Sequence, residues 1–386
     1  MGNVQMKDQY VILTSSKNNT GDFLIKFRAK QLFKALRPDR YIVDYDAWKA
    51  FTREQLMEVN RSKALILMGG PALQKNMRPN IYMMTKNLDD IHVPIITMGI
   101  GWMSPVGDWA STHNYKLNSE TVQLLQRVEK SGYLSSVRDY HTLNTLFSYG
   151  FKNFVMSGCP ALYSLVHIDQ DINISKSFKN ISFSMGVSFT RSSSMRDQAK
   201  SIILKMRDYF NSANFKVVFH HSIGKEFFAA YGANNRFWNA HQEMIAWLKQ
   251  KGIPFMDISG SAENLVEHYS VEDLHIGYRV HAHIFMSSIS KPSILINEDG
   301  RGKALRDVIG GFSLDAYQSR RLNVLLKILD KLRFPVDTYK AANFVSEDLE
   351  QNIKYEQEND FPRLYNHRKL IDRHFKVMNS FIEQLP

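Results

Sequence analysis

The stretch with the clearest chemical potential is Arg279-Val280-His281, which follows the short strand-like run Leu274–Gly277. The residues after it have the apolar spacing of a helix, so Arg279 and His281 are expected where a strand gives way to a helix. A helix N-terminus offers unpaired backbone amides, and an arginine fork matches a carboxylate or a phosphate. The pattern therefore predicts an anion site with a proton-carrying histidine two residues away. The alternative is a structural ion pair at Arg279 and a capping or packing role for His281.

Two further groups follow other predicted strands. The loop 297–303 contains Arg301 and Lys303, and it should open on the same side of the sheet as Arg279, although an ordinary charged turn fits equally well. Arg138 stands at the end of another short apolar run, where it either closes a positive pocket or forms an ion pair with Asp139. All these cations are therefore expected at the carboxyl ends of strands.

The segment Asn19-Thr20-Gly21-Asp22 lies between a predicted strand and a predicted helix, so Asp22 either caps that helix or lines a cleft. Cys159 stands in the turn Gly158-Cys159-Pro160 and is expected to be a small packed residue, because no activating partner is identifiable.

Several motifs fail on inspection. Gly99-Ile100-Gly101 begins like a dinucleotide fingerprint, but Ser104 replaces the third glycine, so a nicotinamide cofactor is not predicted. Gly302-Lys303 lacks the rest of a phosphate-binding P-loop. The pairs His220-His221 and His281-Ala282-His283 lack carboxylates or cysteines at matched spacing, so metal binding is the weaker interpretation and no metal is predicted.

The elements that must position these residues follow one repeated pattern in the first half of the chain. Apolar runs at 10–13, 64–68 and 93–98 each end in glycine or a polar loop. After the first run and its loop, residues 25–36 have apolar residues at the spacing of a helix. Continuous apolar runs are typical of parallel strands covered on both faces. The pattern predicts a Rossmann-like α/β layer.

The pattern lapses in the polar stretch between Ala161 and Ser182 and then restarts as a second α/β region whose last strands are expected at 274–277 and 292–297. We therefore expect a Rossmann-like domain over 1–170, a second over 171–335, and a helical tail over 336–386, with helical period from Arg320 onward. The basic face of the tail is expected to be solvated, and a membrane-surface or partner helix is the alternative.

The composition limits the partners. The 386 residues include 49 Lys+Arg and 38 Asp+Glu, a formal charge of +11, which predicts anionic partners. No nucleic-acid-binding module is present, so nucleic acid is not expected. One cysteine excludes an intrachain disulfide and favours the reducing cytoplasm, and no apolar stretch approaches the roughly 18 residues of a membrane span.

These motifs together resemble the polysaccharide pyruvyl transferase family. The shared motifs, in chain order, are Asn19-x-Gly21-Asp22, Gly69-Gly70, Gly99-x-Gly101, Ser136-Val137-Arg138-Asp139, Gly158-Cys159-Pro160 and Arg279-x-His281-Ala282. The resemblance implies two Rossmann-like domains facing across a cleft, as in GT-B glycosyltransferases. It also implies phosphoenolpyruvate as the donor, a sugar with two suitable hydroxyls as the acceptor, and a donor site containing Arg279 and His281. Pro71 replaces a glycine that is common in the family.

Pyruvyl ketal formation requires a site that holds a carboxylate and a phosphate and moves protons. Our hypothesis is that Arg279 and the amides at the start of its helix bind the donor and that His281 is the general acid/base, while Asp22 orients a hydroxyl or acts as a base. The further substrate-binding candidates are Arg138, Arg301, Lys303, Asn19, Gly21, Gly70 and Gly101. The first domain is expected to be the acceptor side.

No cofactor is expected beyond the donor substrate. The acceptor would be a sugar of an exopolysaccharide or a cell-surface glycan, either free or lipid-linked. We expect the protein to be cytoplasmic, with peripheral contact at the inner face of the plasma membrane as a secondary expectation. The alternatives are a GT-B glycosyltransferase that uses a nucleotide sugar, and a non-catalytic protein that binds anionic glycans.

Overall fold

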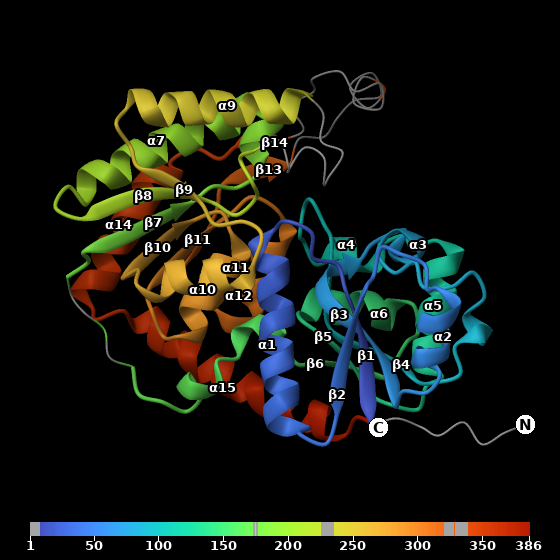
Figure 1. Cartoon of the computed structure of the whole chain (residues 1–386). Helices are drawn as coiled ribbons and strands as arrows, with labels where there is room; N and C mark the ends of the chain where they lie inside the picture. Colours follow the sequence, from blue (N-terminus) through green and yellow to red (C-terminus); the bar gives the residue numbers. More distant parts are fainter. Residues whose placement is uncertain (1–7, 173, 175–176, 225–234, 320–327, 329–338) are drawn as a thin grey trace, which may run out of the picture. The chain divides into compact units, whose positions relative to one another are not determined.

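The computed structural model describes residues 8–172, 174, 177–224, 235–319, 328 and 339–386 (Figure 1). The chain divides into two compact units. Unit 1 comprises the chain up to Ser16, Asp22–Gln170 and Lys369–Pro386, and unit 2 comprises Lys17–Gly21 and Asp171–Arg368. Each unit is an α/β structure around its own parallel sheet, so the predicted fold class of two Rossmann-like layers with a helical C-terminal region is confirmed.

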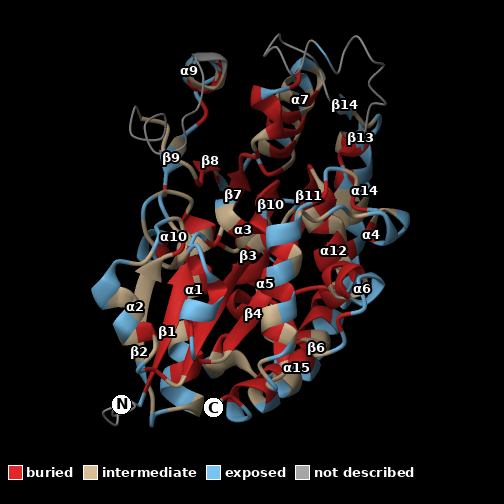
Figure 2. Ribbon diagram, turned by 90° about the vertical axis from the view of Figure 1, so that its right-hand side faces the viewer, coloured by how far each residue is buried: buried red, intermediate tan, exposed pale blue. Residues whose placement is uncertain are grey.

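The sheet of unit 1 has six parallel strands in the order β2-β1-β3-β4-β5-β6. Their bounds are β1 Gln9–Thr14, β2 Tyr41–Asp46, β3 Ala64–Leu73, β4 Ile95–Trp102, β5 Ser135–Val137 and β6 Phe154–Met156. Every residue of β1 and β4 is buried, as expected for strands covered on both faces (Figure 2). Strand β2 was not predicted, because as a half-exposed edge strand it lacks the continuous apolar run of the others.

The helices of unit 1 complete this layer. They are α1 Thr20–Leu36, α2 Arg53–Val59, α3 Met77–Asn80, α4 Ala110–His113, α5 Ser119–Glu129, α6 Tyr140–Ser148 and the end of α15 Pro362–Glu383, with 3-10 turns at Leu88–Asp90, Pro160–Leu162 and Leu165–His167. The predicted apolar face of α1 is buried through Ile25, Ala29, Leu32 and Phe33. The hydrophobic spacing of this helix is therefore explained by its burial against the rest of unit 1.

The structure corrects the expectation that β3 and β4 end at their glycines. Both strands continue through them, to Leu73 and Trp102 respectively. Gly70 and Gly99 adopt positive φ values of 88° and 63°, and the pairing of β3 with β4 shifts register after Gly70. A backbone that glycine can bend to positive φ forms an irregularity inside the sheet instead of ending it.

The sheet of unit 2 also has six parallel strands, in the order β12-β11-β10-β7-β8-β9. Their bounds are β7 Asn180–Ser184, β8 Asn214–Phe219, β9 Phe255–Asp257, β10 Leu274–Gly277, β11 Ser293–Asn297 and β12 Ser313–Asp315. The helices are α7 Ser193–Tyr209, α9 Asn235–Gln250, α10 Ala262–Ser270, α11 Val280–Ser288, α12 Gly300–Ile309, α14 Val345–Glu358 and the start of α15, with a 3-10 turn at Ser188–Thr190. A short antiparallel pair, β13 Tyr317–Ser319 and β14 Tyr339–Ala341, is separate from this sheet.

The end of the chain differs from the sequence expectation. Strand β12 follows β11, which was expected to be the last strand, because three residues are too few for a recognisable apolar run. Residues 320–327 and 329–338, which were expected to be helical, lie outside the described residues. The expected tail 336–386 is divided, since its residues up to Arg368 belong to unit 2 and those from Lys369 to unit 1. Among the described residues no helix is long and apolar enough to cross a membrane.

Candidate functional site

Arg279 is held at the carboxyl edge of the unit 2 sheet. It is the N-cap residue of α11, and its backbone N–H donates to Ser184 Oγ at 3.0 Å. Its Nε donates to Met185 O at 2.6 Å, and its Nη2 donates to Gly186 O at 3.4 Å and to His221 Nδ1 at 2.7 Å. The residue is only 9% exposed. The guanidinium is therefore fixed in one orientation at the ends of β7, β8 and β10.

The contact with Arg279 defines the protonation of His221. A guanidinium only donates hydrogen bonds, so His221 Nδ1 must accept, and the proton of the neutral ring lies on Nε2. Burial first, and the charge of Arg279 second, hold the pKa of His221 well below its usual value. His221 thus presents a neutral Nε2–H donor beside the guanidinium. Its position directly after the end of β8 was the available sequence signal, yet this histidine was considered only as a metal ligand.

The motif Asn19-x-Gly21 meets His281 within unit 2. A Cβ placed on Gly21 would overlap the His281 ring, so only glycine allows this approach. Asn19 Oδ1 accepts from Gly21 N at 3.4 Å, and Thr20 N donates to His220 O at 3.2 Å. Gly21, in the first turn of α1, thus lies directly against His281, in the first turn of α11, a contact that the sequence analysis did not predict.

A buried chain of hydrogen-bonded serines and histidines positions Ser184, which accepts from the backbone amide of Arg279. Ser184 Oγ lies 2.8 Å from His275 Nε2, His275 Nδ1 lies 2.8 Å from Ser293 Oγ, and His283 Nδ1 lies 2.8 Å from the same Ser293 Oγ. Burial lowers the pKa of His275 to about 3 and that of His283 well below its usual value. Both rings are therefore neutral, with one donor and one acceptor each, and Ser184 is held in place to accept from the Arg279 amide. We call these four residues the serine–histidine chain.

Glu298 holds the loop that follows β7. Its carboxylate accepts from Val187 N at 2.8 and 3.1 Å and from Ser188 N at 2.9 Å, and it is 5% exposed. Gly186 has no room for a side chain, because a Cβ there would overlap this carboxylate. The loop therefore presents Gly186 O to Arg279 in a fixed position, a role that the sequence did not reveal.

The two cations of the loop after β11 have different surroundings. Arg301 pairs with Asp299, with Nε at 3.0 and 2.9 Å from the two carboxylate oxygens. Its charge still contributes to the lowered pKa of His221, so it lies within electrostatic range of the Arg279 cluster. Lys303 Nζ lies 3.7 Å from Asp315 Oδ2 on β12. The structure thus brings Arg301 toward the Arg279 cluster and directs Lys303 to the sheet edge.

Unit 1 has its own buried cation, Arg138, at the end of β5. Its Nε lies 3.4 Å from Asp139 Oδ2, and its guanidinium fills the space where a Cβ of Gly101 would stand. Asp139 caps α6 by accepting from Thr142 N at 2.7 Å. Arg138 Nη2 is buried and makes no hydrogen bond with the described residues. A buried donor without a partner is costly, so this edge of the sheet is suited to bind an anion or a hydroxyl oxygen.

Asp22 is placed in the same region of unit 1, in the first turn of α1 and not at its N-cap position. It lines a shallow hollow together with Thr14, Ser15, Ser16, Ile25, Lys26, Met68 and Gly69.

Burial raises the pKa of the Cys159 thiol to about 11, with Arg138 acting in the opposite direction. Cys159 is thus a buried thiol, which fits the packing role predicted for it. The Cβ position of Gly70 is open except for Ile25 at 4.0 Å.

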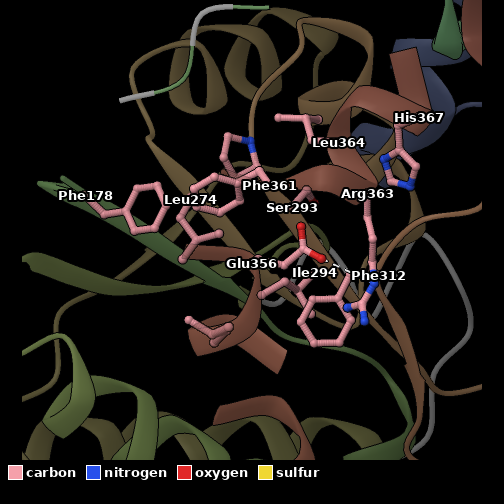
Figure 3. A pocket seen from close by; sticks show the side chains of 12 residues that line it. Phe178, Leu274, Ser293, Ile294, Phe312, Glu356, Phe361, Arg363, Leu364 and His367 are labelled. Carbon is pink, nitrogen blue, oxygen red and sulfur yellow. Dashed lines mark ion pairs between the residues drawn. The ribbon is translucent and has the colours of Figure 1, made fainter. Parts of the chain in front are cut away.

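A larger hollow in unit 2 lies away from these residues (Figure 3). It measures about 400 Å³ including the open solvent within it. Leu274 and Ser293 in its wall begin β10 and β11, so it lies at the end of the sheet opposite to Arg279. Its polar wall includes the Glu356–Arg363 ion pair at 3.2 Å. We therefore assign it no part in the chemistry at Arg279. Within the described ranges, no group of three or more His, Cys, Asp or Glu side chains is arranged to hold a metal ion.

Each unit is thus a parallel α/β layer with its charged candidates at the carboxyl ends of the strands, the edge at which such folds bind ligands. In fold the chain is similar to UDP-GlcNAc 2-epimerase from Neisseria meningitidis, solved with UDP-GlcNAc, with a TM-score of 0.52 at 10% identity over 96% of this chain and 98% of that one. It also aligns with S. aureus MnaA in a structure with UDP, at a TM-score of 0.44 and 12% identity over 91% and 97% of the two chains. At these identities the first likeness shows a shared fold and nothing more. No curated protein matches by sequence.

The chain belongs to the polysaccharide pyruvyl transferase family, whose sequence model matches residues 19–300. The resemblance inferred from the motifs is therefore confirmed. The matched range contains Asn19, Asp22, Arg138, Arg279 and His281, and it ends immediately before Arg301. Arg301 and Lys303 are accordingly features of this chain and not of the family match.

Proposed function

We propose that this chain transfers the pyruvyl group of phosphoenolpyruvate to two hydroxyls of a sugar and so forms a pyruvate ketal. The family supports a transferase of this kind. The single observation that carries the proposal further is the fixed trio of Arg279, the neutral donor His221 and His281 around the N-terminus of α11. Such a trio can hold an anionic donor and move a proton in the same place.

The donor has a carboxylate and a phosphate, so it needs several hydrogen-bond donors that already point to one region. Arg279 supplies a charged planar fork, α11 supplies the amides of its first turn, and His221 supplies Nε2–H. Because Arg279 is held by backbone carbonyls and by Ser184, little reorganisation accompanies donor binding. This preorganisation is what makes the trio a donor site in our proposal.

The reaction that we propose is balanced without any further reagent. One sugar hydroxyl loses its proton and adds to C2 of the enolpyruvyl group, while C3 gains a proton and becomes a methyl group. The bond between C2 and the phosphate oxygen then breaks, and the second hydroxyl loses its proton as it closes onto C2. The products are the cyclic ketal and inorganic phosphate. We assign the proton transfers to His281.

On the side of unit 1 we propose that Arg138 and Asp22 serve the acceptor. Arg138 Nη2 is a buried donor for a sugar oxygen, and Asp22 is positioned to orient a hydroxyl. The acceptor is a sugar of a cell-surface glycan or exopolysaccharide, free or lipid-linked. No cofactor is needed beyond the donor, and a cytoplasmic location, with contact at the inner face of the plasma membrane, follows from such an acceptor.

The first prediction tests the donor site. Replacing Arg279 or His281 with Ala should lower phosphate release from phosphoenolpyruvate, with a glycan acceptor present, by at least a hundredfold, because charge binding and proton transfer are each lost. Arg306→Ala is the matched control, since Arg306 is an exposed cation of unit 2 that pairs with Asp315. Unchanged turnover in a variant with native circular dichroism would refute the assignment.

Ligand-dependent stability separates this proposal from a nucleotide-sugar enzyme. Phosphoenolpyruvate at 100 times its Kd should stabilise the chain by about 2.7 kcal/mol, and UDP should not. A thermal shift with UDP alone would favour the glycosyltransferase alternative instead.

A further inference from the structure

A stack of three aromatic rings stands at the carboxyl end of β4 in unit 1. The ring of Trp109 lies 4.0 Å from that of His141 at 23°, and His141 lies 5.2 Å from Trp102 at 18°. Trp102 and His141 are buried, whereas Trp109 is 48% exposed. One face of the indole therefore rests on a buried support, while nearly half of the residue remains accessible to solvent.

The stack is tied to the same strand ends as Arg138. Trp102 N donates to Thr142 Oγ1 at 2.8 Å, and Thr142 in turn donates to Asp139 Oδ1 at 2.7 Å. Asp139 is also the carboxylate beside Arg138 Nε. Trp109 itself is anchored through its carbonyl, which accepts from the Thr112 hydroxyl at 2.6 Å. The backbone of Trp109 is thus held by Thr112, and the ring beneath its indole, His141, belongs to the helix that Asp139 caps.

Exposure of a tryptophan at this place has a cost, because burial of an aromatic side chain is favourable. Two more large side chains are exposed next to the stack in the sequence. Met103 follows β4 directly and is 37% exposed, and Tyr140 stands between Asp139 and His141 and is 38% exposed. Exposed apolar side chains gathered at a polar strand edge are typical of a ligand-binding surface.

We propose that the exposed face of Trp109 is a platform for a pyranose ring of the acceptor glycan. One face of a pyranose presents C–H groups of partial positive charge, and an indole face is electron-rich, so the two stack favourably while the hydroxyls stay at the edge. Arg138 Nη2 lies at the same sheet edge to meet such a hydroxyl. The inference deepens the proposed function by naming the acceptor contact, but binding at the platform does not require phosphoenolpyruvate.

The test measures sugar binding alone. Saturation-transfer NMR is recorded on the full chain with the methyl glycosides of glucose, galactose, mannose and N-acetylglucosamine, in the absence of phosphoenolpyruvate. At least one glycoside should show transfer concentrated on the protons of one ring face. Trp109→Ala should reduce this signal at least fivefold, and Trp109→Phe should keep part of it, because a smaller ring remains. Phe147→Ala is the control, since Phe147 is 47% exposed on the neighbouring α6 and should leave the signal unchanged.

The outcomes separate this inference from the proposed function. Arg279→Ala should abolish phosphate release and keep the glycoside signal. Sugar binding in the unsubstituted chain, with no phosphate release from phosphoenolpyruvate, would refute the transfer reaction and leave the platform intact. The platform is overturned if no glycoside receives saturation, or if the signal survives in Trp109→Ala. Binding of uridine that depends on Trp109, without glycoside binding, would assign the indole to a nucleobase and overturn it as well.

Discussion

At the scale of single residues, the donor site depends on one tautomer. Arg279 reaches His221 through Nη2 while Nε is occupied by Met185 O, a geometry that needs the planar fork of arginine and that lysine does not reproduce. His221 must then carry its proton on Nε2, whatever the pH above its lowered pKa. The electrostatics of the site are thus set by a neutral histidine next to a permanent cation.

The second prediction compares two substitutions of His221. His221→Leu removes both the acceptor for Arg279 and the Nε2–H donor, whereas Gln in place of His221 retains a carbonyl acceptor and an N–H donor. Hydrogen bonds to charged groups contribute about 1.5–3 kcal/mol, so KM for phosphoenolpyruvate should rise roughly 10- to 150-fold in His221→Leu. The rise should be much smaller in His221→Gln. Steady-state phosphate release provides the measurement, and equal KM values for both variants would contradict the role of His221.

The sequence could predict the site only where its partners are local. Arg279 and His281 stand two residues apart at a recognisable strand-to-helix junction, so residue type and spacing were sufficient. Ser184 and His221 lie 95 and 58 residues from Arg279, and no local pattern links them to it. Lys303 was grouped with the anion site by proximity along the chain, but its ammonium points to Asp315, because side-chain direction on a helix is not given by sequence distance.

At the scale of elements, the close contact between the first turn of α1 and the first turn of α11 requires glycine at position 21. Alanine normally stabilises a helix relative to glycine by about 1 kcal/mol, but here the added methyl group would overlap the His281 ring. The clash is between two residues of unit 2, Gly21 and His281, that are far apart in the sequence. The glycine of the Asn-x-Gly motif is therefore required by packing and not by backbone flexibility.

The third prediction follows as a double-mutant cycle. Gly21→Ala should destabilise the protein by about 1–3 kcal/mol, as expected for overpacking, and should displace His281 enough to lower activity at least tenfold. In the His281→Ala background the same change should cost much less, because the ring is absent and only the close contact with the Cβ of residue 281 remains. Urea unfolding of the four proteins measures this coupling. A cost of Gly21→Ala that is identical in both backgrounds would show that the overlap with His281 is not its cause.

The elements that the sequence predicted best are those buried on both sides. The runs 64–68 and 93–98 were recognised as strands because they are almost entirely apolar, with Thr97 as their one polar residue. Strands β2 and β12 escaped recognition, since an exposed edge and a length of three residues remove that signal. Continuation of β3 through Gly69 and Gly70 was also missed, because a bend at positive φ is usually a loop and not part of a strand.

At the scale of the whole molecule, unit 2 contains several buried histidines that stay neutral at neutral pH. Burial lowers the pKa to about 4 for His241, His268 and His367 and to about 3 for His275. The unfolded values are near 6.5, so these groups are neutral in both states above that pH. Below it, the unfolded chain binds protons that the folded chain does not, and the unfolding free energy falls as the pH falls.

The fourth prediction is therefore acid destabilisation that starts near neutral pH. Each such histidine should remove about 1.4 kcal/mol of unfolding free energy per pH unit between pH 6.5 and about 4. Urea unfolding at pH 8.5, 7.5 and 5.5 should give equal values at the first two pH values within about 1 kcal/mol and a steep loss at the third. His268→Gln should lessen the slope by about one group's share, while a flat profile down to pH 5 would contradict the prediction.

Unit 1 is built from segments that are far apart in the sequence, and this affects its folding during synthesis. During synthesis residues 22–170 emerge before unit 2, but the stretch Lys369–Pro386 that belongs with them emerges after it. At about 5–20 residues per second, translation of the roughly 200 residues between them takes on the order of 10–40 s. Through that interval the nascent first unit lacks the side chains of Ile371, Met378 and Ile382, which are fully buried in the finished fold. The apolar surface that these three side chains contact therefore stays uncovered until the stretch Lys369–Pro386 has been synthesised.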